Sequence, residues 1–222
     1  MSYINGFTNC NIYIEGKGIV KSDLKVEAGK VSSFENKEGL QLDDKYIVVP
    51  GFIDRHIHGS NGSDAMYATF DHLTNISKTI ATEGVTGFLP TTMTDDKGRI
   101  IKALNCIRDY MKEGILEGAQ VLGAHLEGPF ISAKHKGAQP LEYILPCSIE
   151  TFKEFQEASG DNIREVTFAY EENGSELCKY FKENNICASL GHTDATVNDV
   201  LNAVKDGCNS ATHTFNAMKG LH

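Results

Sequence analysis

The sequence predicts an α/β protein with a parallel sheet, preceded by a small unit made of β-strands. In the first fifty residues, short runs rich in β-branched side chains are separated by glycines, which is typical of strands joined by tight turns. From Ile47 onward, apolar strand-like segments alternate with longer helical segments. Alternation of this kind is typical of parallel strands linked by crossover helices.

The first unit covers residues 1–49 and reads as several short strands. The runs NCNIYIEGKGIV and DLKVEAGKVSSFE alternate apolar and polar side chains, and Gly16, Gly18, Gly29 and Gly39 separate them. We therefore expect a small β domain here.

The second unit covers residues 50–222 and contains six predicted strands and five predicted helices. The helices are expected near residues 71–83, 98–116, 148–158, 174–184 and 195–206. A closed (β/α)₈ barrel needs eight strands and about 250 residues. The pattern therefore predicts either an open α/β sheet or a barrel cut short after about six strands.

Composition excludes several classes of function. The formal net charge of -9 disfavours general binding to nucleic acid, which depends on clustered Lys and Arg. No apolar stretch reaches the roughly 18 to 20 residues of a membrane span, so no membrane partner is expected. Six scattered cysteines without a CxxC pair, together with an N-terminus unlike a signal peptide, predict reduced thiols and a cytoplasmic location.

Polar and ionisable side chains lie where four of the predicted strands end. They are Asp54, His56 and His58; His125 and Glu127; His192 and Asp194; and His213 and Asn216. Residues two apart on a strand face the same way, and the carboxyl ends of parallel strands meet at one edge of the sheet. A single strand-end histidine is more often structural, but this repetition favours a metal site for Zn²⁺ or Fe²⁺. On this reasoning His125 and Glu127 are equal candidates for a ligand.

Other catalytic schemes find no support. The sequence contains no GxSxG elbow, no GxxxxGK[ST] phosphate loop and no GxGxxG opening a helix. Cys187 lies near His192 in sequence and could be considered as a nucleophile, but an inert thiol within a strand is the better interpretation.

Five segments together resemble a known family. They are PGFIDRHIHG (50–59), HLEGPF (125–130), KGAQ (136–139), LGHTDA (190–195) and THTFNAMKG (212–220). The first resembles the signature of the amidohydrolase superfamily, and the others are similar to the N-acetylglucosamine-6-phosphate deacetylase family within it. The resemblance covers essentially the whole chain. It implies a (β/α)₈ barrel, truncated here after about six strands, and a small N-terminal β-sandwich domain.

The resemblance also implies a set of metal ligands. They are His56, His58, Glu127, His192 and His213. Some family members lack the first histidine pair and keep one metal ion; because both histidines are present here, two divalent ions, Zn or Fe, bridged by Glu127 are expected. His125 then becomes a structural residue. The general acid/base aspartate of the family is expected beyond residue 222.

The implied activity is hydrolysis of the N-acetyl group of N-acetylglucosamine 6-phosphate. Asn216 and Ala217 match positions that hold the phosphate, and Gln139 stands at a substrate contact where many members have histidine. Family members are commonly dimers, so a homodimer is expected for the full-length protein. Two alternatives stay open: an N-acetylgalactosamine-6-phosphate deacetylase or other amidohydrolase, and an inactive sugar-phosphate or metal-binding fragment that lacks the catalytic aspartate.

Overall fold

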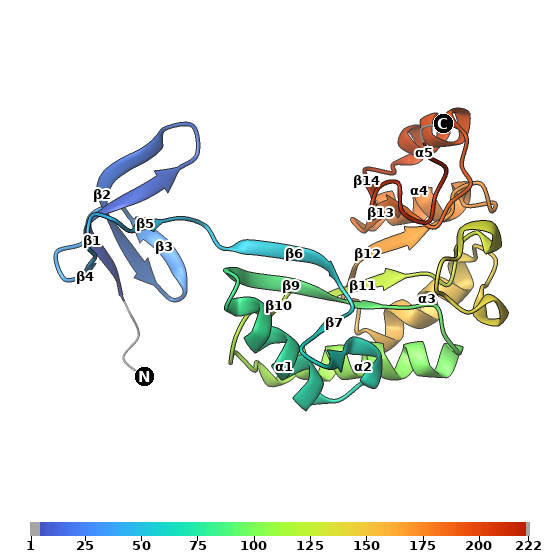
Figure 1. Cartoon of the computed structure of the whole chain (residues 1–222), viewed down its shortest axis with the longest axis horizontal. Helices are drawn as coiled ribbons and strands as arrows, with labels where there is room; N and C mark the ends of the chain where they lie inside the picture. Colours follow the sequence, from blue (N-terminus) through green and yellow to red (C-terminus); the bar gives the residue numbers. More distant parts are fainter. Residues whose placement is uncertain (1–4, 221–222) are drawn as a thin grey trace. The chain divides into compact units, whose positions relative to one another are not determined.

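The computed structural model describes residues 5–220, and the chain forms two compact units that divide between Gly51 and Phe52 (Figure 1). Each unit has its own sheet and its own buried core. The two are therefore considered separately.

The first unit contains one five-stranded sheet with the strand order β3-β2-β1-β4, and β5 also pairs with β1. Its strands are β1 (Gly6–Ile14), β2 (Gly18–Glu27), β3 (Lys30–Ser33), β4 (Leu40–Gln41) and β5 (Ile47–Val48). The turn between β2 and β3 consists of Ala28 and Gly29, which both have positive φ angles, 50° and 73°. Two such residues match the twist of antiparallel strands, so the turn closes a tight hairpin.

The core of this first unit is small. Its buried apolar side chains are Cys10, Ile12 and Leu24. Several large apolar side chains stay exposed, among them Val31 and Phe34. Because residues 5–51 form one sheet, the predicted β-sandwich stays a prediction.

The second unit is built on a parallel sheet whose main strands follow one another in chain order, from β6 through β9, β11, β12 and β13 to β14. The strands are β6 (Phe52–Ile57), β9 (Val85–Thr92), β11 (Ala124–Glu127), β12 (Ile163–Phe168), β13 (Cys187–Leu190) and β14 (Ser210–Ala211). A short strand, β10 (Gln120–Val121), also pairs with β9. The α/β class and the parallel sheet predicted from the sequence are confirmed.

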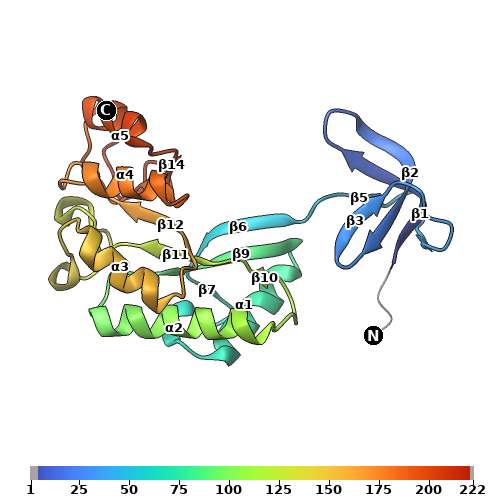
Figure 2. The same cartoon turned by 180° about the vertical axis from the view of Figure 1, so that it is seen from behind.

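Five helices connect these strands, and Figures 1 and 2 show α1, α2 and α3 on the same side of the sheet. They are α1 (Phe70–Ala81), α2 (Lys97–Glu113), α3 (Ile149–Ala158), α4 (Ser175–Glu183) and α5 (Val197–Asp206). Four of the helices begin after a side chain that accepts a hydrogen bond from the first helical turn: Thr69, Asp96, Ser148 and Thr196. Every predicted helix is present, with its ends within a few residues of the expected ones.

The strands of this unit separate an apolar face from a polar face. Leu126 and Val166 are buried in the core shared with the helices. Their neighbours Glu127, Glu165 and Thr167 carry polar side chains, and alternate residues of a strand point to opposite faces. The polar face therefore gathers ionisable groups that the helix-covered face excludes.

Short elements complete the unit. A small hairpin pairs β7 (Gly59–Ser60) with β8 (Ser63–Asp64), and three 3₁₀ turns occur: η1 (Ala65–Tyr67), η2 (Ala133–His135) and η3 (Leu141–Tyr143). Within residues 5–220, no helix is both long enough and apolar enough to cross a membrane.

Candidate metal centre

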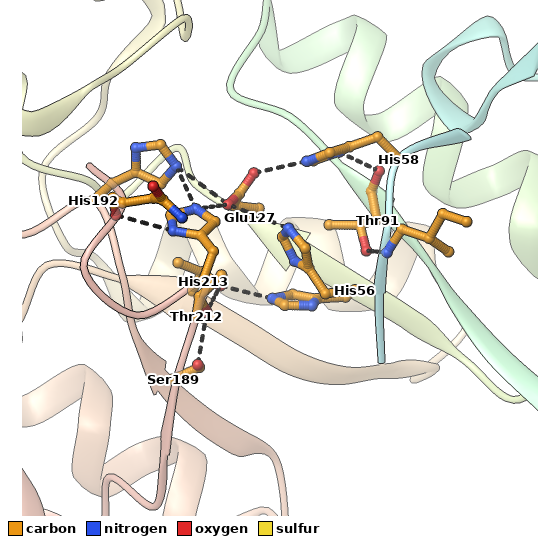
Figure 3. Close-up of polar contacts among 12 residues, drawn as sticks. His56, His58, Thr91, Glu127, Ser189, His192, Thr212 and His213 are labelled. Atoms are coloured by element: carbon orange, nitrogen blue, oxygen red, sulfur yellow. Dashed lines mark hydrogen bonds and ion pairs between the residues drawn. The ribbon is translucent and has the colours of Figure 1, made fainter. Parts of the chain in front are cut away.

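The candidate site lies where β6, β11, β13 and β14 end. His56 is near the end of β6 and His58 follows it, Glu127 ends β11, and His192 and His213 follow β13 and β14. Figure 3 shows the four imidazole rings around the Glu127 carboxylate. The structure thus brings together all five side chains that the family resemblance named as ligands.

The carboxylate of Glu127 contacts the imidazoles on both of its oxygens. Oε1 lies 3.2 Å from His192 Nε2 and 3.0 Å from His213 Nε2, and these two nitrogens are 3.1 Å apart. Oε2 lies 3.1 Å from His58 Nε2. His56 Nε2 is more distant, at 3.8 Å from Oε1. The glutamate side chain is only 2% exposed, so water does not satisfy it.

Hydrogen bonds at the other ring nitrogen fix the tautomer of three of these histidines. The Nδ1–H of His58 donates to the carbonyl of Thr91 at 3.1 Å. That of His192 donates to the carbonyl of His135 at 2.9 Å, and that of His213 to the carbonyl of Asn216 at 3.0 Å. A carbonyl oxygen can only accept, so each neutral ring has its lone pair on Nε2, directed at Glu127.

Lone pairs of nitrogen that face an ionised carboxylate repel it unless a positive charge lies between them. Protons on both rings would not supply that charge favourably, because the Nε2 atoms of His192 and His213 are 3.1 Å apart and two imidazolium groups would repel each other. In a tetrahedral site with bonds of about 2.0–2.1 Å, donor atoms lie about 3.3 Å apart. The three contacts of Glu127, His192 and His213 are close to that spacing, so this donor set fits a divalent metal ion.

A possible metal-binding triad is also formed by His56, Glu127 and His213, whose donor atoms all lie within 4.8 Å of one another. The two triads share Glu127 and His213. The site therefore offers nitrogen and carboxylate donors on more than one side of the glutamate, a ligand set that suits Zn²⁺ or Fe²⁺ better than Mg²⁺ or Ca²⁺.

The pKa values of Glu127, His58 and His192 shift in the direction that favours their charged forms, whereas burial lowers the pKa of His56. Burial alone would raise the pKa of Glu127, but the His192 and His58 rings at its oxygens outweigh it when they carry a second proton, and they hold that pKa far below its usual range. Burial lowers the pKa of His58 and His192, yet their contacts with Glu127 outweigh it and raise both values. The carboxylate is therefore ionised whenever the chain is folded at neutral pH.

His125 takes no part in this cluster of donors. Its Nδ1–H donates to the Arg55 carbonyl at 2.8 Å, and its Nε2 lies 2.7 Å from the Thr167 hydroxyl. Burial lowers the pKa of His125 to about 3, so the ring is neutral. With both nitrogens engaged, His125 links β11 to β6 and β12, a structural role like the one that the resemblance implies.

Gln139 comes from the long segment that follows β11 and is buried beside the site. Its Oε1 accepts the Thr94 N–H at 2.8 Å, and its Nε2 lies 3.1 Å from His192 Nε2. The carboxamide is thus oriented with its N–H groups toward the site. Its predicted contact with substrate stays a prediction.

The segment after β14 places Asn216 and Ala217 next to His213. Their carbonyls accept from His213 Nδ1 and from the Thr193 N–H, respectively. His213 and Ala217 have positive φ angles of 32° and 46°, an uncommon conformation for residues other than glycine. Such local strain is frequent at functional sites. The predicted phosphate contacts of Asn216 and Ala217 stay predictions.

Cys187 does not behave as a nucleophile. Its sulfur is 3.1 Å from an Arg55 guanidinium nitrogen and donates to Asn209 Oδ1 at 3.1 Å. Burial raises the pKa of this thiol, followed by the nearby Glu165 carboxylate. The thiol is therefore protonated at neutral pH, as the sequence predicted for an inert cysteine.

The reasoning from sequence missed Glu171. This residue follows β12, one of the two strands to which the sequence assigned no site residue, and its carboxylate contacts the turn that carries His192. The signal that could have found it is its position, because a carboxylate directly after a parallel strand lies at the same edge as the other strand ends.

Comparison with known proteins agrees with this geometry. The sequence model of the amidohydrolase family matches residues 47–222. The chain belongs to the amidohydrolase family. This family is generally metal-dependent, in accord with the donor set around Glu127.

Curated members of the amidohydrolase family resemble the chain over part of their length. It is 39% identical over 221 residues to an N-acetylglucosamine-6-phosphate deacetylase of Bacillus subtilis (strain 168), covering 95% of this chain and 56% of the relative. It is 35% identical over 180 residues to an N-acetylgalactosamine-6-phosphate deacetylase of Escherichia coli O157:H7, covering 81% of this chain and 48% of the relative. The chain spans about half the length of the curated relatives it matches.

A solved structure shows the same relation. The crystal structure of N-acetylglucosamine-6-phosphate deacetylase from Thermotoga maritima superposes with a TM-score of 0.82 at 32% identity, covering 97% of this chain and 56% of that one. The predicted resemblance to these deacetylases is confirmed.

Proposed function

We propose that the chain is the metal-binding part of an N-acetylglucosamine-6-phosphate deacetylase. The observation that carries the proposal is the direction of the imidazole lone pairs. His58, His192 and His213 each donate Nδ1–H to a main-chain carbonyl, so their Nε2 atoms converge on one buried carboxylate. Similarity to curated deacetylases supports the choice of reaction.

We infer two divalent ions, Zn or Fe, bridged by Glu127. The division of contacts supports this reading, because His192 and His213 lie at Oε1 whereas His58 lies at Oε2. We assign His56 to the second set because its ring centroid is 5.1 Å from that of His58, although its Nε2 lies 3.8 Å from Oε1. The Nδ1 of His56 is buried and has no hydrogen-bond partner within residues 5–220. No hydrogen bond at Nδ1 therefore fixes the orientation of that ring.

The chain's own residues would prepare an acetamide for hydrolysis. A bound divalent ion supplies Lewis acidity toward the amide carbonyl and toward water. Glu127 and the histidines would hold that charge beside a buried carboxylate, where its effect on the carbonyl would be strong. The proton that reaches the leaving amine requires a general acid, for which we expect an aspartate beyond residue 222.

The proposed substrate is an amino-sugar phosphate, held by Gln139, Asn216 and Ala217. Gln139 directs its N–H groups toward the site because Oε1 is held by Thr94. The side-chain amide of Asn216 makes no hydrogen bond among the described residues, so it is free to donate to a phosphate oxygen. Amide donors suit anion binding in a chain of net charge -9.

Several further proposals accompany this function. We infer that units 1–49 and 50–222 are a small β domain and the first part of a (β/α)₈ barrel, which fits a sheet whose strands follow chain order. We also expect the full-length protein to be cytoplasmic and to form a homodimer. Sedimentation of the full-length protein would test the last point.

Metal content tests the proposal directly. We expect about two ions per chain after loading with Zn²⁺, a loss of one in His192→Ala and a loss of the other in His56→Ala, measured by elemental analysis. His72→Ala is a matched control, because His72 contacts Ser63 outside the site. If neither site variant binds less metal than the control, the two-metal proposal is wrong.

Substrate identity needs a separate test in the full-length protein. We expect acetate release from N-acetylglucosamine 6-phosphate to exceed that from N-acetylgalactosamine 6-phosphate. The opposite preference would favour an N-acetylgalactosamine-6-phosphate deacetylase, the activity named for the relative from Escherichia coli. If acetate is released from neither sugar phosphate, an inactive binding protein is favoured.

A further inference from the structure

Glu171 lies at the end of β12 and is anchored to the sheet. Two residues before it, the Ala169 N–H donates to the Phe130 carbonyl at 2.8 Å, and the residue after it, Glu172, donates its N–H to the Ala169 carbonyl at 3.2 Å. The side chain is half-buried. Its backbone is therefore held in place while its carboxylate reaches toward the turn after β13.

Both carboxylate oxygens of Glu171 bind consecutive residues of that turn. The Thr193 hydroxyl donates to Oε2 at 2.5 Å, and the Asp194 N–H donates to Oε1 at 2.5 Å. The same Thr193 oxygen accepts the Ala195 N–H at 3.1 Å. One carboxylate thus binds the two residues directly after His192, and the Thr193 hydroxyl extends the contact to Ala195.

This turn needs external support. His192 has a φ angle of 48°, in the left-handed region that a residue with a Cβ seldom adopts without compensation. Its Nδ1–H donates to the His135 carbonyl and its own carbonyl accepts from Ser132, both in the long segment after β11. Glu171 is the support that comes from the end of the neighbouring strand, β12.

The role of this carboxylate is geometric. Glu171 forms no ion pair within residues 5–220, whereas the adjacent Asp194 is paired with Lys134, His135 and Lys219. A half-buried carboxylate without a cation, whose two oxygens both accept from one turn, orients that turn instead of balancing a charge.

We infer that Glu171 is a positioning residue, which holds the 192–194 turn so that His192 Nε2 faces Glu127. The inference rests on the proposed metal site. Glu171 contacts none of the proposed metal-binding atoms and acts through the Thr193 hydroxyl and the Asp194 N–H. Outer partners of this kind typically change metal affinity by about 10–100-fold when removed.

The test compares three variants of the 222-residue chain, titrated with Co²⁺ and followed by visible absorption. Glu171→Ala is expected to weaken binding by about 10–100-fold. Glu171→Gln keeps an acceptor for the Asp194 N–H and should lose clearly less Co²⁺ affinity than Glu171→Ala. Glu172→Ala removes the same charge one residue away and should bind as the parent does. Circular dichroism should be the same for all three.

A second measurement does not depend on metal. In the metal-free chain, the Asp194 amide should be protected from hydrogen exchange and the His192 Nδ1–H should be visible by NMR; both should be lost in Glu171→Ala and kept in Glu172→Ala. If the parent binds no metal, the proposed site fails while the NMR comparison still decides the role of Glu171. Equal Co²⁺ affinity and equal exchange in Glu171→Ala and Glu172→Ala would overturn the inference.

Discussion

The two units of the chain differ in how much apolar surface each one buries. In the second unit, a continuous core joins strands and helices and includes fully buried aromatic side chains such as Phe152, Phe168 and Phe181. In the first unit, the core consists of Cys10, Ile12 and Leu24.

The exposed surface of the first unit shows the same difference. A cavity of about 420 Å³ there is lined mostly by apolar side chains, including Val31, Phe34 and Val49. Hydrophobic burial is the main force that opposes the conformational entropy of folding. The first unit shows that regular strands and tight turns can define a sheet that buries little apolar surface. The amount of buried apolar surface decides whether such a sheet is stable alone.

The largest expected effect comes from separating the units. A peptide of residues 1–51 should show no cooperative thermal unfolding, because so few apolar side chains are buried in it. A chain of residues 52–222 should keep a cooperative transition and its helical circular dichroism. A sharp transition in the short peptide would show that the comparison of cores is misleading.

Truncation of one aromatic side chain in each unit sharpens the comparison. Phe181 is 0% exposed and packs against Phe152 and Phe168, so Phe181→Ala should lower the free energy of unfolding by about 3–5 kcal/mol. Phe34 is 49% exposed, and Phe34→Ala should cost about 1 kcal/mol. Denaturant titration, with amide exchange to assign each loss to its unit, measures both; similar losses would contradict the comparison.

The smallest expected effect is a difference in pH dependence between one carboxylate in each unit. Burial raises the pKa of Glu165, although the Arg55 guanidinium opposes it. N–H groups of Asn9 and Asn36 lower the pKa of Asp23. A group whose pKa is raised on folding binds more protons in the folded state, so its contribution falls as pH rises above about 4.3. A lowered pKa has the opposite effect, and its contribution is lost as pH falls below about 3.9.

Two isosteric variants test these signs. Relative to Glu165→Gln, the parent should lose stability as pH rises through the weakly acidic range. Relative to Asp23→Asn, the parent should lose stability as pH falls. Amide exchange in each unit across pH 3 to 7 would measure both, and slopes of the same sign would contradict the assignment of causes.

Much of the fold could be predicted from local patterns. Four of the five helices begin where the sequence supplies a side-chain acceptor that satisfies the free N–H groups of the first turn: Thr69, Asp96, Ser148 and Thr196. Alternation of apolar strands and helices predicted a parallel sheet because crossover helices require it. These signals are short-range, so they can be read without knowing which segments meet.

The site could be predicted in part. The positions of the histidines and Glu127 at strand ends indicated that they converge, but strand reasoning alone could not choose between His125 and Glu127. The structure separates them, since His125 uses both ring nitrogens to bind Arg55 and Thr167. Glu171 was missed because its importance depends on which turn lies opposite it.

By itself, the sequence determined the α/β class, the places where helices begin and the residues that could bind a metal ion. The tertiary structure decided which nitrogen of each histidine faces Glu127, because carbonyls of Thr91, His135 and Asn216 accept the other ring N–H. It also decided how the turn after His192 is held. A tautomer depends on an acceptor a few ångströms away, and that acceptor often comes from a distant part of the chain.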